Sequence, residues 1–382
     1  MLCEITSKLV DDFEDERLIY MSTKKKSVNT NAKWLLALFI EIVILGVMVV
    51  GYVIFWVGTK YDKLQILDIK EEDLAINEGA NKEQKGYTTI ALFGIDARDN
   101  VNLGAGNRSD TIMIASINND TKEIKLVSVY RDSLLEIQDG SGLTTKVNAA
   151  YAYGGPELAI KTLNACLDLQ ITEFVTVNWL ALTKAIDCLG GVTVHIEEDE
   201  IQVLNQYIAG QVTVTGIYSD GVFATGNQLL NGTQATAYAR IRSTDRGDIT
   251  RTERQRDVLT KMINKAKGTD MSTIEDIIDE VFPNVYTSIT QDEMYSYVKG
   301  IFSYKLDETV GFPFAYMPVN HAYKGSVLVP ANLEANVSAL HLFLFGTENY
   351  EPTQTVKDIS AKLEAETGVY EQEISIDTYT AE

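Results

Sequence analysis

Cysteine and histidine are scarce in this chain of 382 residues, and neither occurs in a metal-binding spacing. No Cys-x-x-Cys pair and no His-Glu-x-x-His motif is present, which excludes structural zinc clusters and zinc-protease chemistry. Cys166 and Cys188 lie in apolar helical patterns, where each is expected as a buried small hydrophobe, and a disulfide between them is the alternative.

Basic charge is also in deficit, with 33 lysines and arginines against 54 aspartates and glutamates and a formal net charge of -21. A nucleic-acid backbone is bound by a basic face, so no nucleic-acid partner is expected. The chain lacks a Gly-rich loop ending in Gly-Lys-Ser or Gly-Lys-Thr, a Gly-x-Ser-x-Gly elbow, and a histidine beside its arginine-rich segments. A nucleotide-driven motor or a serine hydrolase is therefore disfavoured.

One long hydrophobic run is present, residues 34–57, with Glu41 as its single ionisable side chain. At about 1.5 Å per residue, a helix of this length crosses a hydrocarbon core of about 30 Å, whereas a cleaved signal peptide has an apolar core of only ~7–15 residues. Lysines precede the run with no acid after Met21, an alternative start of the chain. The positive-inside rule then predicts a single-pass protein of the cell membrane, with residues 1–33 in the cytoplasm and the rest outside.

Three further segments follow the predicted span. Residues 58–87 are polar and predict an extracellular stalk. Residues 347–382 carry nine acids against two lysines and predict a disordered acidic tail with at most one short helix near residues 359–363. Residues 88–346 alternate strand-like and helix-like patterns and predict the extracellular catalytic domain.

The pattern in this domain predicts an α/β fold, in which a central, mostly buried mixed sheet has helices on both faces. Apolar or alternating runs favour strands, and periodic runs favour helices. The expected strands are residues 88–95, 111–117, 123–130, 173–178 and 191–196, with a returning strand within 312–330, and the expected helices are residues 146–167, 179–189 and 331–346.

Arginine is unevenly distributed. The chain has ten arginines, of which nine fall between Arg98 and Arg256 and six between Arg240 and Arg256. Lysine is spread along the chain, so the arginines are placed for planar, two-pronged binding of phosphate or carboxylate.

Charged residues also follow the predicted strands. Asp96 ends the first strand, Asp110 opens the second and Arg131 follows the third. If these strands are neighbours, the three side chains share one edge of the sheet, where two carboxylates near arginines would suit Mg²⁺ bridging phosphate oxygens. Capping or turn roles for the aspartates, and a local pair between Arg131 and Asp132, are the structural alternatives.

The arginine-rich segment predicts an extended stretch followed by a helix. Arg240 and Arg242 alternate and so share one side, while Arg251 and Gln255 share the face of the apolar residues in a helix capped near Asp248 or Thr250. Arg254 and Arg256 are expected to be solvated. What these features jointly favour is phosphoryl chemistry, in which arginines and a metal ion hold a phosphate or diphosphate.

Six motifs together resemble the LytR-CpsA-Psr family, over residues 88 to about 265. They read LFGIDAR, NRSDT, SVYRD, KVNAAYAYGG, DCLGGVTV and LNGTQATAYARIR with GDITRTERQR. The resemblance implies a phosphotransferase that moves an anionic glycopolymer, teichoic acid or capsular polysaccharide, from a polyprenyl-diphosphate carrier to peptidoglycan as a phosphodiester. It also implies a cell membrane location, in a Gram-positive bacterium.

The resemblance also assigns residues. Asp96 and Asp110 would hold Mg²⁺ or Mn²⁺, and a hydrophobic channel for the polyprenyl chain would be lined by residues 149–167 and 179–189. Tyr130 stands where the family usually has proline. The diphosphate ligands would be Arg108, Arg131, Arg240, Arg242, Arg251 and Gln255, and the catalytic residues Arg131, Arg240, Arg242 and Asp96.

Three other functions are open. A DNA-binding regulator is disfavoured by the predicted topology, which places the arginines outside the cell. A pyrophosphatase acting on the lipid carrier would use water in place of a sugar hydroxyl. A non-catalytic, glycopolymer-binding membrane anchor would use the same arginines for recognition alone.

Overall fold

The computed structural model describes residue 48 and residues 55–82, 84–97, 102–242, 247–300, 303–370 and 379–380. The chain divides into two units, Met1–Thr59 and Lys60–Glu382. No helix within these described ranges is long and apolar enough to cross a membrane. The predicted cytoplasmic segment 1–33 and nearly all of the predicted span 34–57 lie outside the described residues.

The larger unit is built on one central mixed sheet, as the sequence predicts, and this sheet has eight strands. Its order is β1 (Gln65–Ile66), β10 (Val285–Thr287), β7 (Glu173–Asn178), β2 (Tyr87–Ile95), β3 (Ser109–Asn118), β4 (Glu123–Val129), β11 (Lys305–Phe312) and β14 (Tyr379–Thr380). The pairs β2–β3 and β3–β4 are antiparallel, whereas β2–β7 and β4–β11 are parallel. The end of β2, the start of β3 and the end of β4 therefore meet at one edge.

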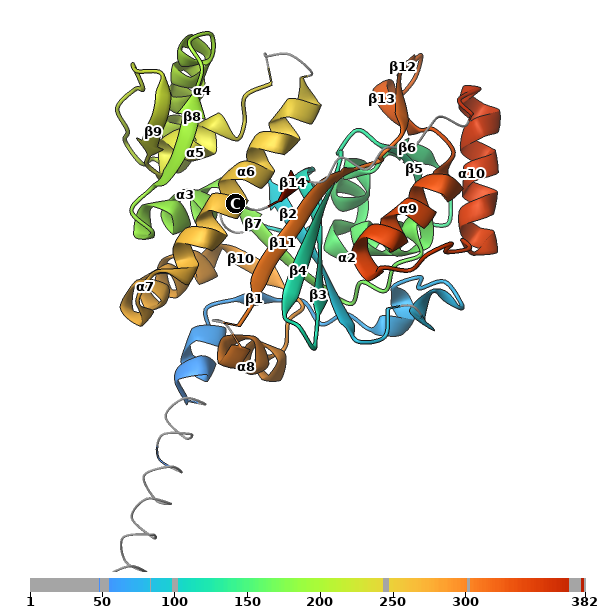
Figure 1. The fold of residues 1–382 in the computed structure, drawn as a ribbon, viewed down its shortest axis with the longest axis horizontal. Coiled ribbons are helices and arrows are strands. Elements are labelled where there is room, and N and C mark those ends of the chain that lie inside the picture. Colours follow the sequence, from blue (N-terminus) through green and yellow to red (C-terminus); the bar gives the residue numbers. More distant parts are fainter. Residues whose placement is uncertain are drawn as a thin grey trace, which may run out of the picture. The chain divides into compact units, whose positions relative to one another are not determined.

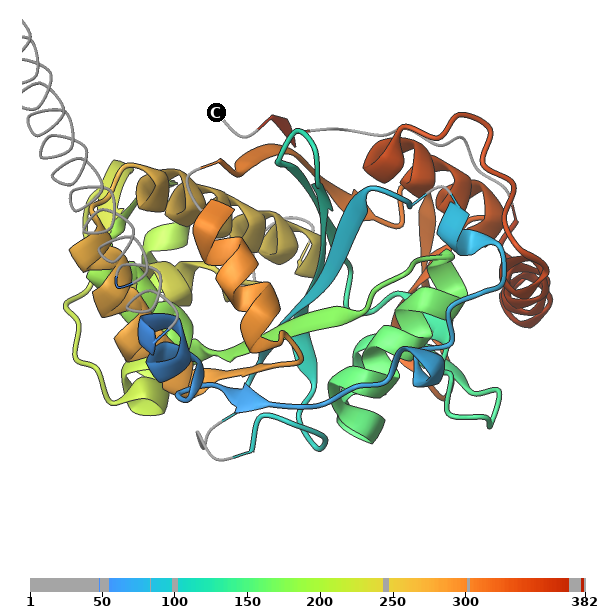
Figure 2. The same cartoon turned by 90° about the horizontal axis from the view of Figure 1, so that it is seen from below.

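Helices cover both faces of this sheet. Figures 1 and 2 show α2 (Asn148–Leu167), α9 (Leu333–Phe345) and α10 (Gln354–Thr367) on one side, and α3 (Trp179–Cys188), α6 (Asp248–Lys267) and α7 (Met271–Val281) on the other. Alternate residues of β3 serve the two faces, because Ile112 and Ile114 join the main core with α2, while Met113 and Ala115 pack toward α6. Residues Gln291–Gly300 form α8.

Three small sheets lie outside the central one. They are β5 (Leu134–Glu136) with β6 (Thr144–Lys146), β8 (Val192–Ile196) with β9 (Gly226–Leu230), and β12 (Tyr316–His321) with β13 (Gly325–Pro330). The predicted strand 191–196 is thus real but belongs to a separate hairpin, which shares a second core with α4 (Glu200–Thr215) and α5 (Gly232–Tyr238). The segment 312–330, predicted to hold one returning strand, contains the end of β11 and the β12–β13 hairpin.

The predicted stalk is wrong for the residues that the structure describes. Leu74 and Ala80 are fully buried in the larger unit, and β1 adds to the central sheet beside β10. Lys60 forms ion pairs with Glu275 and Asp279, at 3.1 and 2.5 Å. Isolated apolar residues in a polar segment are therefore enough to fix it against the domain.

The predicted disordered tail is wrong over residues 354–367. Val356, Ile359 and Leu363 are buried on one face of α10 and belong to the main core. The carboxylate of Asp168, at the end of α2, accepts hydrogen bonds from the backbone N–H and the hydroxyl of Thr353, at 2.7 and 2.6 Å. Acidic composition concealed this helix because its charges lie on the solvent face.

Both cysteines outside the N-terminal unit are free, Cys166 buried and Cys188 half-buried, so they do not form a disulfide. Helix α2 is kinked where Gly154 and Gly155 precede Pro156. Gly155 adopts a left-handed φ of 68°, and a Cβ there would lie 3.3 Å from the backbone nitrogen of Ala105. The kink thus admits the loop that leads to Arg108.

Candidate active site

The first group of site residues comes from the strand ends. Asp96 follows β2, Asp110 lies at the start of β3, and Arg131 follows β4. The three strands are neighbours in the sheet, so the condition for these side chains to share one edge is met, and Arg131 Nη1 donates to Asp110 Oδ1 at 2.6 Å. Asp132 is 3.8 Å from Arg131 Nε and accepts a shorter contact from Lys146 at 2.8 Å. The local pair between Arg131 and Asp132 is therefore the weaker of the two contacts of Asp132.

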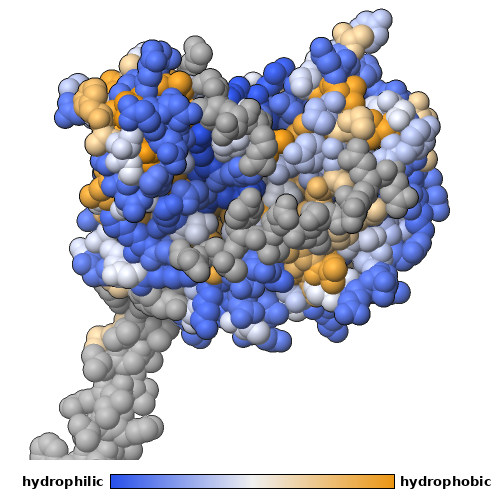
Figure 3. All heavy atoms as spheres, turned by 45° about the horizontal axis from the view of Figure 1, so that its top comes forward, coloured by the Kyte–Doolittle hydropathy of each residue, from blue (hydrophilic) through white to orange (hydrophobic). Residues whose placement is uncertain are grey.

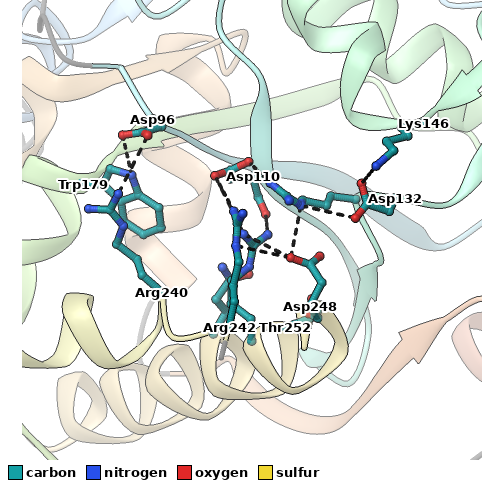
Figure 4. Close-up of polar contacts among 12 residues, drawn as sticks. Asp96, Asp110, Asp132, Lys146, Trp179, Arg240, Arg242, Asp248 and Thr252 are labelled. Atoms are coloured by element: carbon teal, nitrogen blue, oxygen red, sulfur yellow. Dashed lines mark hydrogen bonds and ion pairs between the residues drawn. The ribbon is translucent and has the colours of Figure 1, made fainter. Parts of the chain in front are cut away.

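Helix α6 supplies a carboxylate that the sequence suggested only as a cap. Asp248, in its first turn, lies 3.2 Å from Arg131, 3.3 Å from Arg251 and 3.6 Å from Arg242. Figure 4 shows Arg242 between Asp110 and Asp248, with which it forms contacts of 3.3 and 3.6 Å. Two carboxylates therefore hold three arginines in one cluster.

Arg251 is the most buried of these arginines, with its side chain 3% exposed. Its Nη2 donates to the backbone carbonyl of Asp110 at 2.6 Å. Burial and the neighbouring Arg131 and Arg242 lower the pKa of Arg251 to about 10, although Asp248 opposes the change. Burial opposes the charge of Arg131 too, but the carboxylates of Asp248, Asp110 and Asp132 raise its pKa. Both guanidinium groups are therefore charged at neutral pH.

A second group surrounds Asp96. Its Oδ1 accepts a hydrogen bond from Trp179 Nε1 at 3.1 Å, and Arg240 Nη2 lies 3.9 Å from its Oδ2. The guanidinium group of Arg240 also lies over the Trp179 ring, 5.0 Å from its centroid, and donates to Gln211 Oε1 at 2.6 Å. Gln211 is fully buried on α4. Arg240 is thus fixed by partners from three different elements.

A polar pocket of about 510 Å³ joins both groups. Its surface holds five arginines against two aspartates, which suits an anion with several negative charges. Figure 3 shows strongly hydrophilic atoms gathered in a recess of this face. The pocket is lined by Asp96, Arg108, Asp110, Arg131, Trp179, Tyr207, Arg240, Arg242 and Arg251.

The arginines predicted to bind the diphosphate all line this pocket, whereas Gln255 does not. Arg108 is exposed and forms no ion pair with any described residue, so it is available to a ligand. Gln255 is buried and faces a different pocket, where its Nε2 donates to the carbonyl of Ala239 at 3.4 Å.

The prediction that Arg254 and Arg256 are solvated is wrong, since they are 6% and 4% exposed. Arg254 Nη2 lies 2.5 Å from Glu200 Oε1, a pair that is buried on both sides. Arg254 lies on the side of α6 that, through Val258, joins the second core, whose packing could not be inferred from the spacing along the helix.

The carboxylates of Asp96 and Asp110 offer hard oxygen ligands of the kind that Mg²⁺ prefers. The described residues include no group of three or more His, Cys, Asp or Glu that could enclose a metal ion. Mg²⁺ commonly keeps several waters and binds through one or two carboxylates and substrate phosphates. The two aspartates fit a metal shared with a phosphorylated ligand, rather than one enclosed by protein.

An apolar pocket of about 250 Å³ lies next to the polar one. Of the two predicted lining segments, residues 179–189 contribute Trp179 and Leu182. Residues 149–167 contribute nothing, because α2 covers the opposite face of the sheet. The lining residues are Leu92, Phe93, Gly94, Ile95, Thr111, Met113, Val175, Val177, Asn178, Trp179, Leu182, Ala239, Gln255, Val258 and Leu259.

Comparison with known proteins gives a consistent set of relatives. The model of the LytR_cpsA_psr family matches residues 55–332. A Bacillus mycoides protein named polyisoprenyl-teichoic acid–peptidoglycan teichoic acid transferase TagU is 30% identical over 264 residues, which are 67% of this chain and 80% of that protein.

Two solved structures share the fold. One, from Enterococcus faecalis, is described as a transcriptional regulator; it is 26% identical with a TM-score of 0.56, over 76% of this chain and 98% of that one. The other, Bacillus subtilis TagV, is also 26% identical with a TM-score of 0.51, over 70% and 99%.

Proposed function

The chain belongs to the LytR-CpsA-Psr family, and from this premise we propose that it is a phosphotransferase that moves an anionic glycopolymer, a teichoic acid or capsular polysaccharide, from a polyprenyl-diphosphate carrier to peptidoglycan. One observation carries the proposal. An arginine-lined pocket adjoins an apolar pocket, and Trp179 lines both. A donor with a diphosphate head and a hydrocarbon tail has this same division between charged and apolar parts.

In the proposed reaction, a hydroxyl oxygen of the peptidoglycan acceptor attacks the phosphorus that carries the glycopolymer. A new P–O bond forms, the P–O–P bridge breaks, polyprenyl monophosphate leaves, and the hydroxyl proton passes to solvent. The product is a phosphodiester between polymer and peptidoglycan. The reaction adds negative charge to the leaving phosphate, so its rate depends on positive groups placed where that charge develops.

The arginines of this chain supply those groups. Arg131, Arg240 and Arg242 line the polar pocket and would contact the phosphate oxygens, with Arg108 and Arg251 completing the surface. Asp110 and Asp248 hold the cluster in place before a ligand binds. Mg²⁺ or Mn²⁺, held by Asp96 and Asp110 together with the diphosphate, would neutralise charge on the phosphates.

A transcriptional role, the description given to the Enterococcus faecalis relative, has less support in this chain. The described arginines of the cluster converge on one pocket and pair with carboxylates, rather than forming a basic face. DNA binding relies on many separate phosphate contacts along such a face. We also propose, from the hydrophobic run 34–57, a single membrane span that places the pocket outside a Gram-positive cell.

The test uses the full chain, purified in detergent, with polyprenyl-diphosphate-linked polymer, a peptidoglycan oligomer and Mg²⁺. Transfer is expected, and Arg131→Ala should abolish it, while Lys70→Ala, which removes an exposed cation outside the pocket, should not. Full transfer by Arg131→Ala would refute the assignment. Release of polymer phosphate without a glycan product would indicate a pyrophosphatase, and tight donor binding without turnover would indicate a binding anchor.

A further inference from the structure

Trp179 lies at the boundary between the polar and the apolar pocket. Of the described residues, it alone lines both the polar and the apolar pocket. It is 6% exposed and is the first residue of α3, directly after β7. The parallel register pairs Ile95 with Asn178, so the residues that follow them, Asp96 and Trp179, are neighbours at the same strand edge. The backbone itself therefore places the indole beside Asp96.

Three contacts give the indole a defined orientation. Its N–H donates to Asp96 Oδ1 at 3.1 Å, its ring lies under the guanidinium group of Arg240 at 5.0 Å, and the ring also forms part of the apolar wall with Leu182. Figure 4 shows Asp96, Trp179 and Arg240 together, apart from the Asp110 cluster. A shift of this one ring would therefore move a carboxylate and an arginine together.

We propose that Trp179 is a positioning residue that couples the lipid tail to the reacting phosphates. The inference rests on the proposed function and identifies the residue that links the binding of the lipid tail to the placement of the phosphates. A tail in the apolar pocket packs against the indole and restricts it. The restricted indole holds one oxygen of Asp96 through its N–H and fixes the plane of Arg240 through its ring. The other oxygen of Asp96, which lies 3.9 Å from Arg240 Nη2, would then be the one that holds a metal ion shared with the diphosphate.

Two substitutions separate these interactions. Trp179→Phe keeps an aromatic ring under Arg240 and beside the tail but removes the N–H that donates to Asp96. Because that hydrogen bond is made to a charged group, kcat should fall roughly tenfold with donor KM unchanged. Trp179→Ala also removes the packing against the tail. The full-length protein should then lose the dependence of kcat on prenyl chain length, while KM still responds to chain length through the remaining pocket walls.

The experiment compares donors with long and short prenyl chains in wild type and both variants, with Trp56→Phe as the matched control. If Trp179→Ala kept the wild-type dependence of kcat on chain length, the inference would be overturned. If Trp179→Ala did not fold, as judged by circular dichroism, Trp179→Phe would decide the question, and a kcat equal to that of wild type would refute the role.

A second readout does not require transfer. Trp34, Trp56 and Trp179 are the tryptophans of the chain, so Trp34→Phe with Trp56→Phe leaves Trp179 as the single reporter. Farnesyl monophosphate, used as a tail probe, should shift the emission of Trp179, and an unchanged spectrum at saturating probe would contradict the inference. If the single-tryptophan protein shows this shift but neither it nor the wild-type chain transfers polymer, the proposed function alone would be refuted.

Discussion

Glu173 offers a sharp thermodynamic test of the structure, far from the arginine pocket. It lies at the start of β7, is 8% exposed, and accepts hydrogen bonds from the Tyr297 hydroxyl at 2.8 and 2.7 Å. Burial raises the pKa of Glu173 from 4.5 to about 7, with Tyr297 opposing the rise and Glu293 adding to it. The folded protein therefore keeps a proton that the unfolded chain has lost between these two pH values.

The direction and size of the effect on the free energy of unfolding follow from the linkage between proton binding and folding. Because the folded-state pKa is the higher one, the contribution of Glu173 to the free energy of unfolding is intact below pH 4.5 and falls as the pH rises to about 7. At about 1.4 kcal/mol per pKa unit, the full loss above pH 7 is about 3 kcal/mol. Glu173→Gln removes the titration and keeps an oxygen that accepts from Tyr297, so above pH 7 the variant should be more stable than wild type by up to this amount.

The assay is urea unfolding of the full chain at pH 4.5, 6 and 8, for wild type and Glu173→Gln. Other carboxylates titrate in both proteins and cancel in the difference, which should grow by about 2 to 3 kcal/mol from pH 4.5 to pH 8. Tyr297→Phe removes the hydrogen bond that favours the charged carboxylate of Glu173. The free energy of unfolding of this variant should therefore depend more strongly on pH than that of wild type. A difference between wild type and Glu173→Gln that is the same at all three pH values would show that the carboxyl is not buried as described.

Three further predictions concern the site and its support. Arg131→Lys keeps the charge but not the planar fork, so kcat should fall roughly hundredfold in the transfer assay, and a near-normal rate would contradict two-pronged binding. Arg254→Met leaves the carboxylate of Glu200 buried without its cationic partner and should lower the free energy of unfolding in urea by about 3 to 5 kcal/mol, most of it recovered by adding Glu200→Gln. Val258→Phe places a larger side chain in the wall of the apolar pocket and so reduces the room for the lipid tail. If two CH₂ groups of a long-chain donor are displaced, at about 0.8 kcal/mol each, KM for that donor should rise roughly tenfold. Binding of inorganic pyrophosphate, measured by calorimetry, should not change.

The sequence predicted the parts of the site that depend on strand ends and helix faces. Asp96, Asp110 and Arg131 meet because β2, β3 and β4 are neighbours, and Arg251 points inward because it shares a helical face with Val258. The place of each residue at a strand end or on a helix face follows from periods of two and of 3.6 residues, which are visible in any sequence, whereas the adjacency of the three strands is known only from the structure.

Contacts between elements were not predictable in this way. Tyr207 and Gln211 reach the site from α4, whose position is set by the second core rather than by any motif. Asp248 could have been noticed as an acidic residue three positions before Arg251, but that spacing also describes an ordinary helix cap. Trp179 could have been placed from the pairing of β7 with β2, which the sequence did not specify.

The predicted boundaries of the domain were wrong for a related reason. The segments before β2 and after α9 are polar on average, and only a few apolar side chains, such as Leu74 and Val356, fix them to the domain. Average composition measures how much of a segment is polar, whereas docking depends on whether its few apolar groups find a complementary surface.

The separation of the two hydrophobic cores has a consequence for how the protein responds to its ligand. Arg131 follows a strand of the main core, whereas Arg240 lies between Ala239 and Ile241 of the second core. A diphosphate held by both arginines would act as a non-covalent crosslink between two separately packed bodies. Its binding energy would then appear as slower hydrogen exchange in β8 and β9, which contribute no residue to the pocket lining.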